Sequence, residues 1–155
     1  MKTFLTTAAF VIFLDQFIKS LVKTGMKLYD SIQIIKDNIL NITYIENSGI
    51  SFGMLNRDYG SIQRWVLVAV VLTAMIAIVY YWARHPKQNF LYNFSCGLIL
   101  GGAAGNLIDR VFNGRVVDFI EVGFKSFKYP VFNVADCGIS CGVFFFILYV
   151  LFERN

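Results

Sequence analysis

Apolar residues gather in long runs along the chain, separated by stretches in which polar and apolar positions are mixed. Four runs are long enough to cross a hydrocarbon core, which takes about 20 helical residues at about 1.5 Å each. They predict transmembrane helices at residues 3–22, 65–83, 89–108 and 131–152. An even number of spans places both ends of the chain on the same side of the membrane.

The first run resembles the start of a secretory signal peptide, because Lys2 precedes an apolar stretch. A signal peptide would continue into a cleavage site made of small residues. The residues that follow here are Asp15 and Gln16. We therefore expect a retained first span.

The two longer inserts, residues 23–64 and 111–130, fall on the side of the membrane opposite the termini. Residues 40–44 (LNITY) alternate apolar and polar side chains, and residues 116–120 (VVDFI) are β-branched and aromatic. Both patterns are typical of strands. The sequence thus predicts an integral membrane protein, mainly α, in which four transmembrane helices carry a small sheet at the membrane surface. Residues 1–155 are expected to form one domain.

Composition supports a membrane protein and argues against a nucleic-acid-binding one. Hydrophobic residues make up 57% of the 155 residues and charged residues 15%, against about 45–50% and about 25% in soluble domains. The net charge is +4, but no run of Lys or Arg could follow a phosphate backbone. The count of basic residues leaves the orientation in the membrane ambiguous.

The sequence predicts neither a metal site nor a cofactor. The three cysteines, Cys96, Cys137 and Cys141, lack CxxC spacing and lie in apolar runs, where we expect packing roles. No HExxH, Ser/His/Asp arrangement or Walker-type glycine loop occurs, which argues against a zinc enzyme, a serine hydrolase and a nucleotide-dependent enzyme.

Several ionisable residues lie in or beside the apolar runs, where each needs a partner, an interface or a function. Asp15 and Lys19 are spaced i,i+4 and can pair on one helix face. Asn106, Asp109 and Arg110 form a polar end to the third span. Both groups are equally compatible with purely structural roles at a membrane boundary.

Asp118 and Asp136 are the strongest candidates for chemistry. They are 18 positions apart, and the residues between them include Gly123 and Pro130, so the chain can fold back and bring the carboxyl groups together. Two carboxyl groups in a poorly hydrated site cannot both ionise. One can then activate water while the other protonates a carbonyl oxygen. The spacing alone leaves open a surface Asp118 and an Asp136 that caps a helix.

Five polar blocks resemble, in order, those of bacterial lipoprotein signal peptidases, also called signal peptidase II. They are residues 15–19 (DQFIK), 47–53 (NSGISFG), 101–110 (GGAAGNLIDR), 116–119 (VVDF) and 132–136 (FNVAD). One departure is visible: Ile50 and Ser51 stand where the family has two alanines. We expect this change to leave catalysis intact and to alter the pocket wall.

The resemblance implies an aspartic endopeptidase of the bacterial cytoplasmic membrane. Both termini would be cytoplasmic, and the active site and a small β-cradle would lie towards the extracytoplasmic face. Asp118 and Asp136 would form the catalytic dyad. The supporting residues would be Asn47, Gly49, Asn106, Arg110 and Asn133 around the site, with Asp15, Lys19 and Asp109 bracing it.

The implied substrate is a prolipoprotein whose lipobox cysteine carries a diacylglyceryl group, and cleavage would fall just before that cysteine. The resemblance also implies that membrane lipids surround the protein. It implies no cofactor and no obligate protein partner. Residues 47–57, which include Gly49 and Gly53, are a candidate lid.

Two other function classes compete with a peptidase. A small proton- or ion-coupled carrier would use the embedded carboxylates. A non-catalytic scaffold would use the small residues 101–105 for close helix association. The five blocks favour the peptidase over both.

Overall fold

The computed structural model describes residues 1–49, 60–85, 89–124 and 127–153. Its four long helices are α1 (Lys2–Gly25), α2 (Gly60–Arg84), α3 (Phe90–Asn113) and α4 (Val134–Glu153). Each is long and apolar enough to cross a membrane. The four predicted spans are therefore confirmed as helices.

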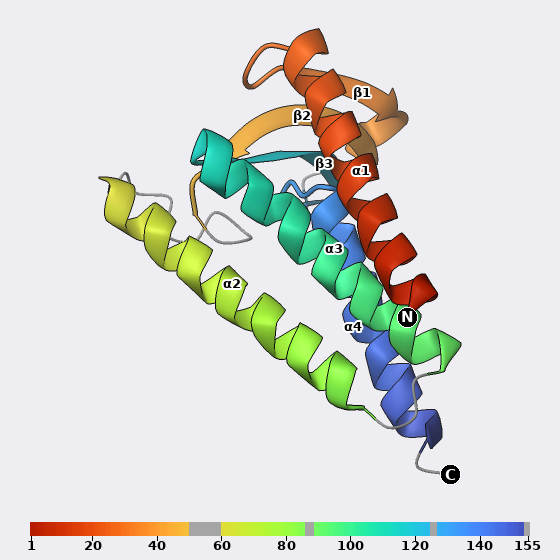
Figure 1. Ribbon diagram of the computed structural model, residues 1–155. Coiled ribbons are helices and arrows are strands. Elements are labelled where there is room, and N and C mark those ends of the chain that lie inside the picture. Colours follow the sequence, from red (N-terminus) through yellow and green to blue (C-terminus); the bar gives the residue numbers. More distant parts are fainter. Residues whose placement is uncertain (50–59, 86–88, 125–126, 154–155) are drawn as a thin grey trace.

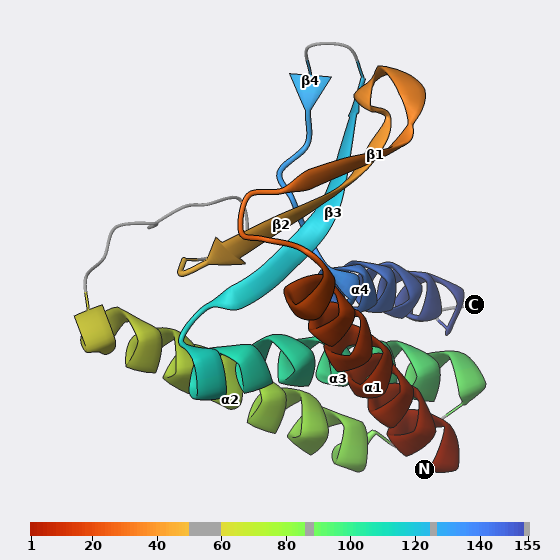
Figure 2. The same cartoon turned by 90° about the horizontal axis from the view of Figure 1, so that it is seen from above.

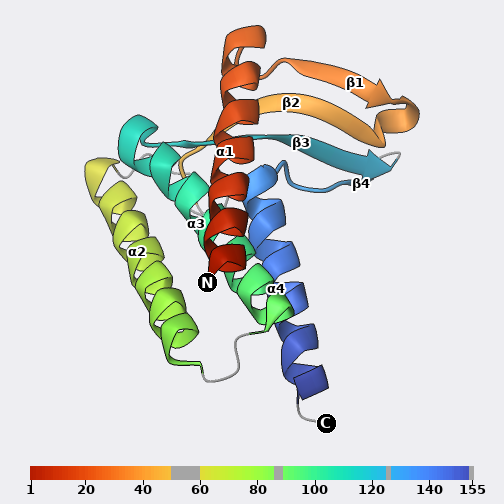
Figure 3. The same cartoon turned by 45° about the vertical axis from the view of Figure 1, so that its right-hand side comes forward.

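Helix α3 is the centre of the bundle. α1 and α4 pack against it, and α2 lies on the outside, where its main helical neighbour is also α3 (Figure 1). Both ends of the chain lie at the end of the bundle away from the sheet (Figure 3). The charged residues of α3, Asp109 and Arg110, are in its last turns, at the end that carries the sheet.

A four-stranded antiparallel sheet covers the other end of the bundle (Figure 2). Its strands, in spatial and chain order, are β1 (Ser31–Ile35), β2 (Leu40–Asn47), β3 (Val116–Phe124) and β4 (Phe127–Lys128). A short 3-10 helix, η1 (Lys36–Asn38), connects β1 and β2. The central pair β2–β3 joins the two predicted strand segments, so the expected small sheet is confirmed.

Several helix boundaries differ from those predicted: α1 ends three residues later, at Gly25, and α2 begins five residues earlier, at Gly60. α3 continues five residues beyond Ile108, because its polar last turns are satisfied inside the protein instead of ending at lipid headgroups. Residues 131–133 are not helical: Phe132 pairs with Ile120 of β3, and Asn133 caps α4. α4 thus begins at the sheet.

Glycines in α3 allow the helices to approach closely. A Cβ at Gly101 would lie 2.8 Å from the carbonyl oxygen of Ala8 in α1. A Cβ at Gly105 would lie 2.6 Å from Oδ2 of Asp15. The expectation that residues 101–105 form a small-residue packing face is confirmed.

We predict that Gly105→Ala lowers stability by about 1–3 kcal/mol, because the added methyl group pushes against the Asp15 carboxylate. Thermal unfolding in detergent would measure the loss. Gly25→Ala is the matched control, since a Cβ there meets nothing within 4 Å. Equal unfolding temperatures for the two variants would contradict the close approach at Gly105.

Candidate active site

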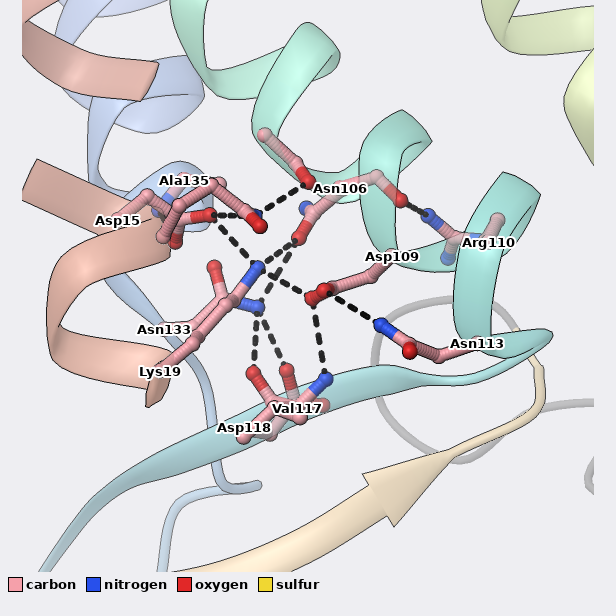
Figure 4. A network of polar contacts seen from close by, with 12 residues as sticks. Asp15, Lys19, Asn106, Asp109, Arg110, Asn113, Val117, Asp118, Asn133 and Ala135 are labelled. Carbon is pink, nitrogen blue, oxygen red and sulfur yellow. Dashed lines mark hydrogen bonds and ion pairs between the residues drawn. The ribbon is translucent and has the colours of Figure 1, made fainter. Parts of the chain in front are cut away.

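Lys19 is the centre of a buried polar network at the sheet end of the bundle (Figure 4). Its Nζ lies 2.8 Å from Oδ2 of Asp15 and 2.9 Å from Oδ2 of Asp109. It also donates a hydrogen bond of 3.1 Å to Oδ1 of Asn106. The three ammonium hydrogens thus have three acceptors, as a buried charge requires. The predicted Asp15–Lys19 pair is present, and it links α1 to α3.

The remaining oxygen of Asp15 holds the start of α4. Its Oδ1 accepts a hydrogen bond of 2.9 Å from the backbone N–H of Ala135. The first N–H groups of a helix have no partner within the helix and attract negative charge. Asp15 therefore joins a third helix to the network.

Asp109 joins the sheet to the same network. Its Oδ2 accepts a long hydrogen bond of 3.4 Å from the backbone N–H of Val117 in β3. Its Oδ1 accepts from Asn113, one turn later in α3, at 3.3 Å. Asp109 is buried, so it connects elements inside the protein and does not contact lipid headgroups.

Asn133 caps α4 through a reciprocal pair of hydrogen bonds with Asp136. Oδ1 of Asn133 accepts from the backbone N–H of Asp136 at 2.9 Å, and the backbone N–H of Asn133 donates to Oδ2 of Asp136 at 3.2 Å. This is the capping-box arrangement, with Asp at the third helical position. The cap fixes the Asp136 carboxyl group at the N-terminus of α4.

The side-chain amide of Asn133 also reaches Asp118. Its Nδ2 lies 2.7 Å from Oδ1 of Asp118, 3.1 Å from Oδ1 of Asn106 and 3.2 Å from the carbonyl oxygen of Val117. Nδ2 of Asn106 in turn donates to Oδ1 of Asp136 at 2.8 Å. Two asparagines thus bridge Asp118 and Asp136, and the structure brings the two predicted carboxyl groups into one site.

Asp118 is buried and has no cation within ion-pair distance among the described residues. Burial, together with the negative charge of Asp136, raises the pKa of its carboxyl group to about 6. The hydrogen bond of 3.0 Å from Nδ2 of Asn47 acts in the opposite direction and lowers the pKa. Asp118 thus retains a proton at a pH where an ordinary aspartate has lost it.

A cavity of about 380 Å³ opens at the two carboxyl groups. Its walls come from the segment that precedes α4 and from one side of α4, and they are mostly apolar. The lining residues include Asp118, Asp136, Tyr129, Phe132, Cys137 and Cys141. The paired carboxyl groups therefore face a space that suits an apolar chain.

The family described as signal peptidase (SPase) II matches residues 7–152. The chain belongs to the signal peptidase II family. A lipoprotein signal peptidase of Bacillus velezensis is 41% identical over 148 residues, which are 96% of this chain and 93% of the relative.

Two solved structures of bacterial membrane enzymes, obtained by the in meso method, have the same fold. The one at 2.3 Å resolution has a TM-score of 0.87, and the one at 1.9 Å has 0.84. Both are 33% identical; they cover 100% and 97% of this chain and 91% and 94% of their own chains. As a member of the signal peptidase II family, the chain is a membrane-embedded aspartic peptidase.

Arg110 and Asn47 lie at the edge of the candidate site of this signal peptidase II family member. Nη2 of Arg110 donates to the carbonyl oxygen of Gly49 at 3.1 Å. Oδ1 of Asn47 accepts from the backbone N–H of Gly49 at 2.9 Å, which forms a turn after β2. Both contacts fix the start of the candidate lid. Residues 50–59, which include the Ile50–Ser51 departure and most of that lid, lie outside the described residues.

Some members of the network were not among the predicted residues. Gln16 donates to both Asp15 and the carbonyl oxygen of Gly105, at 3.1 Å each. Asn113 continues the polar face of α3, and its spacing from Asn106 and Asp109 could have identified it.

All three cysteines were expected to have packing roles, but only Cys96 is buried, whereas Cys137 is half-buried and Cys141 is exposed. Cys96 is buried in an apolar cluster, as predicted. Cys137 and Cys141 instead line the cavity beside the carboxyl groups. Within the described residues, no group of three or more His, Cys, Asp or Glu side chains could hold a metal ion.

We predict that Lys19→Met destabilises the protein by about 3–5 kcal/mol, because it leaves Asp15 and Asp109 as buried, uncompensated charges. Thermal unfolding in detergent would measure the effect. Lys23→Met, one turn later in α1, is the control and should change little.

A triple variant separates charge from packing. Lys19→Met combined with Asp15→Asn and Asp109→Asn removes all three charges, so it should recover part of the lost stability. A triple variant that is less stable than Lys19→Met would show that the loss does not arise from uncompensated charge.

Proposed function

We propose that the chain removes the signal peptide from diacylglyceryl-modified prolipoproteins, with Asp118 and Asp136 as a catalytic dyad. The observation that supports the dyad is the pair of bridges through Asn133 and Asn106, which hold both carboxyl groups at one cavity. Family membership and the Bacillus velezensis relative support the substrate class.

Asp118 carries the shared proton in the proposed mechanism, because its pKa is raised by burial and by the neighbouring carboxylate. Asp136 takes a proton from a water molecule, and the water oxygen attacks the carbonyl carbon before the lipidated cysteine. Asp118 gives its proton to the carbonyl oxygen, which forms a gem-diol. Proton transfer to the leaving amine and collapse of the diol then break the C–N bond.

The supporting residues contribute by positioning the dyad and the substrate. Asn47 and Asn133 orient the Asp118 carboxyl group by hydrogen bonds of 3.0 and 2.7 Å. Arg110 and Gly49 border the space in which the substrate backbone would lie, and an ordered backbone lowers the entropic part of the barrier. Lys19, Asp15 and Asp109 hold the elements that carry the dyad.

The proposed site suits a substrate that stays in the membrane. The cavity is mostly apolar and runs along α4, so a lipid-linked chain can reach the carboxyl groups without leaving the bilayer. We further propose that residues 1–155 form one domain with both termini in the cytoplasm and the sheet on the extracytoplasmic side. Membrane lipids surround it, and the chemistry uses no cofactor and no obligate protein partner.

We predict that Asp118→Asn and Asp136→Asn each lower cleavage by at least about 100-fold, because each removes one of the two proton-transfer groups. The measurement is a gel-shift assay with purified protein and a prolipoprotein, with and without prior diacylglyceryl modification. Only the modified substrate should be cleaved. Asp37→Asn is the control: Asp37 is exposed, and its positive φ of 62° suits Asn.

Two outcomes would contradict the proposal. Full activity of either dyad variant would remove that carboxyl group from the mechanism. Equal cleavage of modified and unmodified substrate would contradict the lipid requirement. Thermal unfolding of each variant shows whether a loss of activity reflects a loss of fold.

A further inference from the structure

The two faces of the sheet differ sharply in side-chain chemistry. Successive residues of a strand point to opposite faces, so Ile120, Val122 and Phe124 share the face of Asp118. The strand pairing extends this apolar face across the sheet. The paired residues on it are Ile120 with Ile42 and Ile32, Val122 with Leu40 and Ile35, and Phe124 with Phe127.

The opposite face is polar in its outer part. Ser31 is 2.8 Å from Thr43 (Oγ to Oγ1), and Thr43 Oγ1 donates to Oε2 of Glu121 at 2.5 Å. Lys128 forms an ion pair with the same carboxylate. Asn41 lies opposite Glu121 in the register. This face is a connected row of polar groups.

The apolar face of the sheet is more exposed than the polar face, which is the opposite of the arrangement expected in water. The polar Asn41 and Glu121 are only 3% and 5% exposed. The apolar Val122, Phe124 and Phe127 are 38%, 59% and 70% exposed. An antiparallel sheet with one face in water turns its polar face outward. An exposed apolar face of this extent marks an interaction surface.

The exposed face meets a membrane-spanning helix at one end. Asp118 lies on it, and the Asp118 carboxyl group contacts Asn133 at the start of α4. The sheet extends sideways from the end of the bundle, and β4 is the strand nearest to α4 (Figure 3). The apolar face of the sheet is therefore continuous with the apolar exterior of α4.

We infer that this face of the sheet docks on the lipid bilayer, with the paired Phe124 and Phe127 at its outer end as anchors. The occupant is the interfacial zone of the leaflet that surrounds the first turn of α4. Continuity with a membrane-spanning helix selects lipid over water, and aromatic side chains are favoured at that depth. The inference does not depend on the proposed chemistry.

Photo-crosslinking of the intact protein tests this docking. The photoreactive residue p-benzoylphenylalanine is placed at position 32 or 127 on the apolar face. The matched control is position 33, because Ile32 and Gln33 are adjacent, both exposed, and on opposite faces of β1. Each protein is reconstituted into vesicles of phosphatidylethanolamine and phosphatidylglycerol, irradiated and analysed by mass spectrometry.

Lipid adducts should form at positions 32 and 127 in several-fold higher yield than at position 33. Similar yields at all three positions would overturn the inference, since the two faces would then meet the same surroundings. Adducts to a second copy of the chain in place of lipid would also overturn it. Thermal unfolding of each substituted protein confirms that the sheet is intact before the yields are compared.

Discussion

The buried ammonium group of Lys19 is the interaction on which the arrangement of the other elements depends. An unpaired ion in this interior would cost several kcal/mol, so the chain must keep three oxygen acceptors within reach of one nitrogen. Two of them belong to Asp15 and Asp109, whose second contacts lie on α4 and β3. One charge cluster thereby fixes three helices and the sheet relative to one another.

The neighbouring carboxyl pair contrasts with this cluster. Lys19 has two carboxylates within 3 Å, whereas Asp118 is held by the amide groups of Asn47 and Asn133. Amides position a carboxyl group without neutralising its charge, so the pKa of Asp118 stays raised. Asn106 connects the two regions, since it accepts from Lys19 and donates to Asp136. The protein thus combines an ion-paired cluster around Lys19, which provides rigidity, with a pair of carboxyl groups that has no direct cation partner among the described residues and is suited to proton transfer.

Local patterns were sufficient to predict the four helices, the two central strands and the Asp15–Lys19 pair. The contact between Lys19 and Asp109 joins residues 90 positions apart, so no local period could reveal it. β1 is exposed along its whole length and β4 has only two residues, which leaves both without a strong pattern. The resemblance to signal peptidase II named the site residues. Their mutual contacts through Asn106 and Asn133 required the fold, because they depend on how α3, β3 and α4 meet.

The contrast between the ion-paired cluster around Lys19 and the Asp118–Asp136 pair is tested most directly by titrating the Asp118 carboxyl group in the intact protein. The titration is followed by NMR of protein labelled with carbon-13 at the aspartate carboxyl carbons. One resonance should titrate near pH 6 and disappear in Asp118→Asn. In Asn47→Ala the same resonance should titrate at higher pH, because a hydrogen bond to the charged form is lost. An Asp118 resonance that titrates near the ordinary value of 3.8 would contradict a buried, under-compensated pair.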